Sequence, residues 1–254
     1  MKALEIDDLY FKYENSDKMI TDGLSLSINK NEFVTIIAPS GTGKSTLFRL
    51  ILGLLEPTQG IIKVESDGDH SSIIGYMPQR DCLMPWRTVL DNTSIGLELN
   101  GFSKKEARKK AASYFGSFNL SGTERMYPHE LSGGMRQRAS FLRAIVNNPS
   151  LLLLDEPFSS LDALTRRKMQ TWLLSLCQKE KNTVFMITHD IEEALLLSDR
   201  ILICTEVPYR NLKSIEVNIK RPRNYETTLT GKFTDLKREI INILDSLDEK
   251  KEGK

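Results

Sequence analysis

Hydrophobic and polar positions alternate along this chain in two rhythms. Short apolar runs with the length of buried strands occur at 33–37, 151–154, 183–188 and 201–204. Apolar residues recur every three or four positions, as on one face of a helix, at 45–55, 163–179 and 191–197. Strands that alternate with helices predict right-handed crossovers and a parallel sheet with helices on both faces. The pattern therefore predicts an α/β fold.

The first quarter of the chain adds further strands. Residues 3–37 have the pattern of several β segments, and two more short apolar runs follow at 61–65 and 72–77. Between them, the helix expected at 45–55 has four apolar residues on one face, Leu47, Leu50, Ile51 and Leu54.

A predominantly helical pattern covers residues 88–148. Within it, Ser103 and Glu106 have the spacing of a capping box, and a further helix is expected at 133–147. A last helical stretch runs from 233 to 247. We expect one domain over 1–205, in which the helical subdomain occupies about 88–148. A strand and helix extension at 206–254 is expected to pack on the core.

Bulk composition limits the classes of partner. Lys plus Arg number 35 and Asp plus Glu 34, so the charge balance gives no reason to expect nucleic acid as a partner. The N-terminal residues include acids where a signal peptide needs an apolar run, and the aliphatic run at 151–154 is far too short to span a bilayer. We expect a cytoplasmic protein. Work at a membrane would require another polypeptide to cross it.

The three cysteines, Cys82, Cys177 and Cys204, are far apart and have no metal-binding spacing. We expect ordinary buried or half-buried thiols in a reducing compartment.

The segment APSGTGKST at 38–46 lies between a predicted strand and a predicted helix. A phosphate-binding loop needs backbone N–H groups without Cβ obstruction, a lysine, a hydroxyl for magnesium and a helix N-terminus. Gly41, Gly43, Lys44 and Ser45 supply these groups. The nucleotide-binding residues expected in the loop are Ser40, Gly41, Thr42, Gly43, Lys44, Ser45 and Thr46.

Ala38 stands where the usual phosphate-loop pattern begins with glycine. An alanine is strained there only if its φ is positive, at a cost of about 1–2 kcal/mol. Because this position lies at the strand end, away from the expected phosphate contacts, our hypothesis is that Ala38 leaves nucleotide binding intact.

Two carboxylates, Asp155 and Glu156, follow the apolar run at 151–154. The C-terminal edge of such a strand is where α/β sheets place their ligands. Asp155 can hold the magnesium shell and Glu156 can polarise a water molecule. Adjacent acids after a strand could instead simply cap the following turn.

A second anion site is predicted where Ser132, Gly133 and Gly134 begin a helix. The hydroxyl, the bare N–H groups and the positive end of the helix dipole suit a phosphate. An N-cap alone explains Ser132 but not the paired glycines, because glycine weakens a helix start relative to alanine.

These three elements, in this order, resemble the ATPase subunit of ATP-binding-cassette (ABC) transporters over roughly residues 3–205. The Walker A, signature and Walker B motifs are similar to APSGTGKST, LSGGM and LLLLDE. Four further positions match family motifs by resemblance: Gln79 as the Q-loop glutamine, Asp162 in the D-loop, His189 as the switch histidine, and Tyr13 as the aromatic ring against adenine.

This resemblance implies a P-loop NTPase with a RecA-like parallel sheet core, an antiparallel β subdomain and a helical insertion. It implies ATP and Mg²⁺ as ligands, the metal being held by Ser45, Gln79 and Asp155. Glu156 would be the general base, His189 would contact the γ-phosphate, Gln79 would link magnesium to the membrane subunits, and Lys44 would neutralise phosphate charge.

The resemblance also implies an assembly. A homodimer, or a pseudo-symmetric pair, would sandwich two ATP molecules head to tail. Each would lie between the phosphate loop of one subunit and Ser132, Gly133, Gly134 and Asp162 of the other. Integral-membrane permease subunits would be the direct partners and a substrate-binding protein an indirect one, which places the chain on the inner face of the cell membrane.

Met135 replaces the glutamine that usually closes the signature, so the contacts across the dimer must rest on Ser132 and the glycine amides. The segments around Met135, after Gln79 and at 214–225 resemble the nitrate/sulfonate/taurine importer branch, which includes carriers of vitamin precursors. In that branch the segment 83–92 lies beside the membrane subunits. Trp86, within this segment, could belong to that partner surface or could instead be a core aromatic.

Several alternatives stay open from sequence alone: an ABC exporter, a soluble ABC ATPase that acts on DNA or ribosomes, a GTPase, and a binder that does not hydrolyse. Heptads, tandem cassettes and basic arms, which the soluble ATPases carry, are missing, and no guanine-reading N-K-x-D element is present. Glu156 and His189 argue against the binder. His70 and His129 are interpreted as a solvated and a local structural residue. The transported substrate is not encoded here.

Overall fold

The computed structural model describes residues 1–38, 42–65, 74–159, 161–180, 182–204 and 208–252. These residues form two compact units. Unit 1 comprises Met1–Glu65 and Arg167–Lys254, and unit 2 comprises Ser66–Arg166. No helix among the described residues is both long and apolar enough to cross a bilayer.

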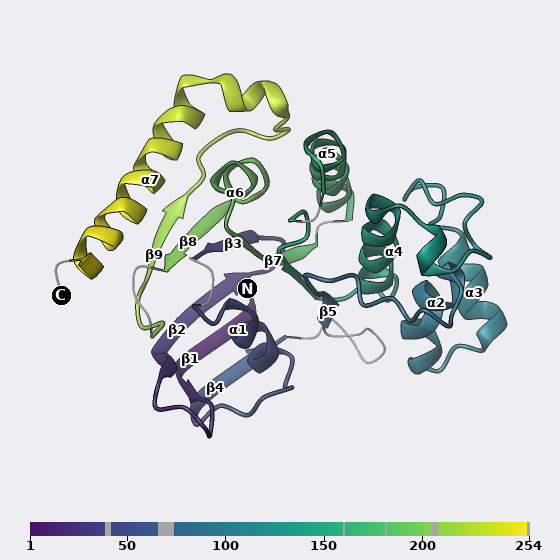
Figure 1. Cartoon of the computed structure of the whole chain (residues 1–254), viewed down its shortest axis with the longest axis horizontal. Coiled ribbons are helices and arrows are strands. Elements are labelled where there is room, and N and C mark those ends of the chain that lie inside the picture. The colour runs from purple at the N-terminus through teal and green to yellow at the C-terminus, as the bar shows by residue number, and fades with distance from the viewer. Residues whose placement is uncertain (39–41, 66–73, 160, 181, 205–207, 253–254) are drawn as a thin grey trace. The chain divides into compact units, whose positions relative to one another are not determined.

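Unit 1 contains two groups of strands (Figure 1). The strands β1 (Lys2–Lys12), β2 (Met19–Asn29) and β4 (Gln59–Val64) form an antiparallel sheet in the order β2-β1-β4. The strands β7 (Thr183–Thr188), β3 (Phe33–Ile37) and β8 (Arg200–Cys204) run parallel, and β9 (Leu212–Glu216) pairs antiparallel with β8. Every residue of β3 and β7 is buried, as expected for strands covered on both faces.

Unit 1 also contains α1 (Lys44–Ile51), α6 (Ile191–Leu197), η2 (Tyr225–Leu229) and α7 (Gly231–Glu252), together with most of α5 (Ala163–Glu180). Figure 1 shows α7, in yellow, beside β9. Phe233 and Ile240 of α7 are buried in one apolar cluster with residues of β3, β8, β9 and α6. The extension after residue 206 therefore contributes Phe233 and Ile240 to the core of unit 1.

Unit 2 pairs β5 (Ile74–Met77) parallel with β6 (Leu151–Asp155). Its helices are α2 (Val89–Leu99), α3 (Lys104–Ala112), η1 (Pro128–Glu130) and α4 (Gly133–Ile145). The expected capping box is confirmed at the start of α3, because the Ser103 hydroxyl accepts from the Glu106 N–H and the Glu106 carboxylate accepts from the Ser103 N–H.

Two expectations were wrong in detail. The helix expected at 45–55 ends at Ile51, since Gly53 turns the chain with φ 68°, and Leu54 is 68% exposed instead of sharing the buried face. Cys82 is exposed, whereas Cys177 is half-buried and Cys204 is buried as expected.

Candidate functional site

The phosphate loop ends at Gly43, which is the N-cap of α1 and has φ 95°. This left-handed conformation costs a residue with a Cβ about 1–2 kcal/mol. A Cβ at Gly43 would also lie 2.5 Å from Cγ2 of Ile20. In the part of the chain that the structure describes, no side chain caps this end of α1, so the backbone N–H groups of its first turn suit an anion. Ser40 and Gly41 lie outside the described residues.

Lys44 and Ala38 interact across the loop. Lys44 is 7% exposed, and its Nζ donates a hydrogen bond to the carbonyl oxygen of Ala38 at 3.0 Å. Ala38 does not have a positive φ. The condition for strain at this alanine is therefore not met, which supports the hypothesis that Ala38 leaves nucleotide binding intact.

Tyr209, which sequence reasoning did not select, supports the loop from the interior. It is fully buried, and its hydroxyl lies 2.8 Å from Oγ1 of Thr42 in a hydrogen bond. Burial raises the pKa of this phenol, so it stays neutral. Its backbone N–H donates to the carbonyl of Ile20, the residue packed against Gly43. Since 167 positions separate Tyr209 from Thr42, no local pattern could have revealed the contact.

Tyr13, expected against adenine, lies next to the same helix start. Its hydroxyl is 2.9 Å from Oγ1 of Thr46, and its ring packs edge-on against Phe11 with centroids 5.1 Å apart. Tyr13 lines an open hollow of about 550 Å³ whose other walls include Leu55 and Pro57. An aromatic face beside the phosphate loop suits a planar base.

His189 is exposed at the end of β7, directly before α6. The buried carboxylate of Glu193 supports this turn, because it accepts from Oγ1 of Thr188 at 2.7 Å and from Nε2 of Gln170 at 3.3 Å. Thr188 Oγ1 in turn accepts from the Asp190 N–H at 3.1 Å. Unit 1 thus contains Gly43 and Lys44 at the start of α1, Tyr13, and His189, the predicted switch histidine.

In unit 2 the two carboxylates lie at the end of β6, as predicted. Asp155 is 3% exposed. Glu156 has φ 46°, a conformation that a non-glycine residue adopts at a cost of about 1–3 kcal/mol and that clusters at functional sites. Gln79 Nε2 donates to Oε2 of Glu156 at 3.1 Å, so the structure brings the predicted Q-loop glutamine to the predicted base.

The signature turn is built as the sequence predicts. Ser132 is the N-cap of α4, and its hydroxyl accepts from the Met135 N–H at 3.3 Å. A Cβ at Gly133 would meet open space, apart from an arginine tip at 3.9 Å. At Gly134 it would lie 2.9 Å from Cγ2 of Thr165, so glycine is needed there for packing as well as for a bare N–H. Sequence reasoning missed this second requirement.

Asp162 caps the start of α5. Its Oδ1 accepts from the backbone N–H groups of Leu164 and Thr165, each at 3.1 Å. Hydrogen bonding from the Thr165 side chain, followed by that from its backbone N–H, holds the pKa of this carboxyl below its usual value. Thr165 therefore donates to the carboxylate of Asp162, the predicted D-loop residue, and also occupies the space that a Cβ at Gly134 would need.

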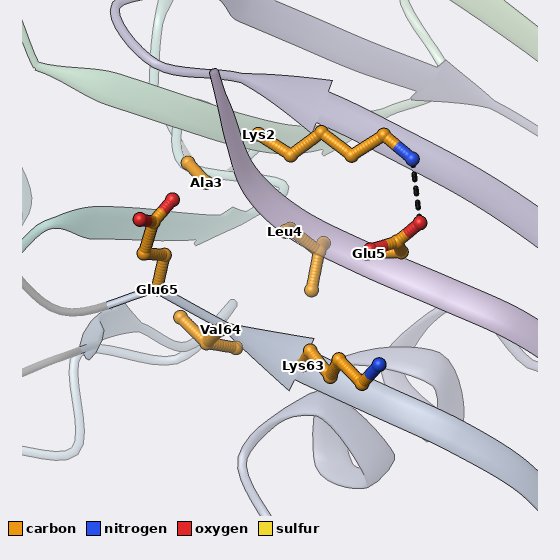
Figure 2. Close-up of a pocket in the computed structure, with 7 residues that line it drawn as sticks. All are labelled: Lys2, Ala3, Leu4, Glu5, Lys63, Val64 and Glu65. Carbon is orange, nitrogen blue, oxygen red and sulfur yellow. Dashed lines mark hydrogen bonds and ion pairs between the residues drawn. The ribbon is translucent and has the colours of Figure 1, made fainter.

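A separate cavity of about 330 Å³ lies between β1 and β4 (Figure 2). It is lined by Lys2, Ala3, Leu4, Glu5, Lys63, Val64 and Glu65. Lys2 and Glu5 pair with each other there, and none of the candidate site residues lines it. Within the described ranges, no cluster of three or more His, Cys, Asp or Glu residues could bind a metal.

A strand, a glycine-ended loop with a buried lysine and a helix start define the class of phosphate-loop nucleotide-binding proteins. Comparison with known proteins extends this. The model of the family described as ABC transporter matches residues 21–159. The chain is 49% identical over 96% of its length to the formylaminopyrimidine import ATP-binding protein ThiZ of Halalkalibacterium halodurans, and it covers 96% of that protein. The chain therefore belongs to the ABC transporter family.

Two other similarities agree with this assignment. The aliphatic sulfonates import ATP-binding protein SsuB 1 of Rhodococcus jostii is 42% identical, with 75% of each chain covered. The dimeric structure of a post-hydrolysis state of the ATP-binding cassette MJ0796 bound to ADP and Pi matches with a TM-score of 0.73 and 28% identity, covering 85% of this chain and 100% of that one. The predicted fold class, an ABC nucleotide-binding domain, is thereby confirmed.

Proposed function

We propose that this chain is the ATP-hydrolysing subunit that energises import of a small nutrient through separate membrane subunits. As a member of the ABC transporter family the chain is an ATPase. The importer assignment rests on one observation above the others, the 49% identity with an import ATP-binding protein over 96% of this chain. That relative carries formylaminopyrimidine in its name, so a heterocyclic vitamin precursor is the substrate class we favour here.

In this proposal the phosphates of ATP are bound by Lys44 and by the backbone N–H groups at the start of α1. Ser40, Gly41, Thr42 and Gly43 complete the loop, Ser45 and Thr46 follow in the first turn of the helix, and Tyr13 faces the adenine. The buried position of Lys44 supports the assignment, because an ammonium group away from water interacts more strongly with phosphate.

The residues expected to hold Mg²⁺ fit that ion chemically. Ser45 offers a hydroxyl, Gln79 an amide oxygen and Asp155 a carboxylate, and Mg²⁺ prefers oxygen ligands of this kind. Asp155 is 3% exposed at the end of β6, directly before Glu156. When bound, the ion would neutralise phosphate charge.

The hydrolytic step assigned to this chain is in-line attack of water on the γ-phosphorus, in which the bond from that phosphorus to the bridging oxygen breaks and ADP leaves. Glu156 would accept the proton of that water, His189 would contact the γ-phosphate, and Gln79 would position the carboxylate it already touches. The left-handed backbone of Glu156 and its hydrogen bond to Gln79 support a fixed carboxylate at this position.

A second copy of the chain would complete each site. Ser132, Gly133 and Gly134 offer a hydroxyl and bare N–H groups at the start of the thirteen-residue helix α4. Asp162 would contact the partner copy beside them. The dimeric cassette structures to which this chain is similar support the arrangement.

The permease is proposed to dock on the segment 83–92, which places the chain at the inner face of the cell membrane. Trp86 is 75% exposed, so it is not a core aromatic, and tryptophan is a residue type enriched at protein–protein interfaces. Buried Asn92 holds this segment in shape, because its amide bonds the carbonyls of Met84, Arg87 and Thr88. The surface is thus ordered.

The test is ATPase activity of the purified chain assembled with its permease in lipid vesicles. Loaded substrate-binding protein in the vesicle lumen should stimulate hydrolysis at least about tenfold, since docking would complete the assembly that brings the catalytic groups together. Binding protein without substrate serves as the control. An equal rate with and without the loaded binding protein would contradict the importer assignment.

A further inference from the structure

Helix α6 directly follows His189 and Asp190, so its placement sets where His189 lies. The start of α6 has its own cap, because Oδ1 of Asp190 accepts from the N–H groups of Glu192 and Glu193 at 2.8 and 3.1 Å. The other end differs. A helix leaves its last four carbonyls without intrahelical partners, and α6 has no basic residue in its last turn.

Arg223, from the C-terminal extension, supplies donors to that end. It is 4% exposed, and its Nη1 donates to the carbonyls of Leu195, at 3.0 Å, and of Ser198. Nη2 and Nε donate to the carbonyls of Val217 and Ile219 at 2.9 and 3.0 Å. Burial lowers the pKa of Arg223 to about 10, so it remains cationic at neutral pH and complements the negative end of the helix. One guanidinium thus joins α6 to the segment after β9.

Arg221 repeats the contact two residues earlier. Its Nη2 donates to the carbonyl of Leu197 at 2.7 Å, and its Nε and Nη2 donate to Oδ1 of Asp199 at 2.9 and 2.7 Å. Oδ2 of Asp199 accepts from the N–H of Phe33 at 3.0 Å. Phe33 begins β3, the strand that leads to the phosphate loop. Arg221 therefore connects the end of α6 with the start of that strand.

The rest of the extension holds these arginines in place. Phe233 and Ile240 of α7 pack in the apolar cluster that includes Ala194 and Leu195 of α6. Lys237 forms an ion pair with Glu192 at 2.6 Å, although both side chains are more than a third exposed, so this pair contributes little. The contact between extension and helix is thus made mainly by the two arginines and by apolar packing.

We propose that Arg221 and Arg223 are positioning residues for His189: they fix the C-terminal end of α6 and thereby hold the histidine at the γ-phosphate. This inference rests on the proposed role of His189. It assigns the sequence RPR at 221–223 a function in hydrolysis that is separate from nucleotide binding at the phosphate loop.

Arg223→Lys tests this proposal, because lysine keeps the charge but cannot form four hydrogen bonds in the planar geometry of a guanidinium. Single-turnover hydrolysis by the full-length chain should slow about tenfold, since a small misplacement of a catalytic group can cost up to about 100-fold. The Kd for ADP should stay within about twofold, since ADP lacks the γ-phosphate. Arg238→Lys, on the exposed face of α7, is the matched control and should change neither value.

The decisive comparison repeats Arg223→Lys in a His189→Ala background. If the arginine acts through the histidine, the second substitution should change the remaining rate by less than about twofold. A full tenfold loss in both backgrounds would overturn the positioning role while leaving the proposed function intact. An unaltered rate in His189→Ala alone would instead contradict the proposed function. If the Arg223→Lys protein does not fold, Arg221→Lys is made in both backgrounds instead, since Arg221 is only half-buried. The single-turnover rate should then fall about threefold when His189 is present, and it should not fall in the His189→Ala background.

Discussion

Replacing Lys44 with alanine should weaken ATP binding about 100-fold. Hydrogen bonds between a charged donor and phosphate contribute roughly 1.5–3 kcal/mol each, so the loss of one or two corresponds to about 3 kcal/mol. Because Lys44 is buried, water screens its charge little, so we expect its hydrogen bonds to phosphate to contribute energies at the upper end of this range. Equilibrium binding of a fluorescent ATP analogue measures the change.

The fold should survive this substitution. The hydrogen bond from Lys44 Nζ to the carbonyl of Ala38 contributes about 1 kcal/mol to stability. Lys63→Ala, at an exposed position of β4, is the control and should bind ATP like the wild type. Unchanged affinity in a folded Lys44→Ala protein would mean that the phosphates bind elsewhere.

Replacing Glu156 with glutamine should reduce the hydrolysis rate about 1,000-fold, because a positioned general base contributes roughly 10²–10⁴-fold and an amide cannot accept the proton. ATP affinity should change less than about threefold, since the phosphate loop is untouched. Glutamine has the same length as glutamate, and its carbonyl oxygen can still accept the hydrogen bond from Gln79 Nε2, so the turn should keep its shape. Release of labelled phosphate in a single turnover is the measurement.

Glu239→Gln, on the exposed face of α7, removes the same charge away from the site and should hydrolyse ATP at the wild-type rate. A Glu156→Gln protein that retains more than about a tenth of the wild-type rate would show that another group activates the water.

The elements that sequence patterns located best are those buried on all sides. The runs at 183–188 and 191–197 coincide with β7 and α6. A fully buried strand needs an unbroken apolar run, and a helix after an aspartate cap begins at a visible signal. The end of α1 was placed too late, since periodicity continues to Leu54 although Gly53 has already left the helix. A periodic pattern does not register a single glycine in a left-handed conformation.

The residue types of the site could be predicted from the sequence, because phosphate chemistry restricts them to short motifs. Contacts between positions far apart in the sequence could not be predicted. Tyr209 behind Thr42, Thr165 against Gly134 and Arg223 on the end of α6 each depend on the folded chain bringing separate segments together. A buried tyrosine or arginine has no local signature, because its partners are hydroxyls and carbonyls that most residues carry. The left-handed backbone of Glu156 was equally invisible, since glutamate gives no sign of positive φ.

The central claim is that two copies of this chain close around ATP, with the phosphate loop of one opposite Ser132, Gly133 and Gly134 of the other. Light scattering of Glu156→Gln with Mg²⁺ and ATP tests it most directly, because this variant should retain the nucleotide that joins the copies. We expect a mass of twice 28.9 kDa with ATP and of 28.9 kDa without it. For the double variant Ser132→Arg, Glu156→Gln, we expect a mass of 28.9 kDa both with and without ATP. For Glu156→Gln alone, a mass of 28.9 kDa under both conditions, with ATP shown to be bound, would contradict the claim.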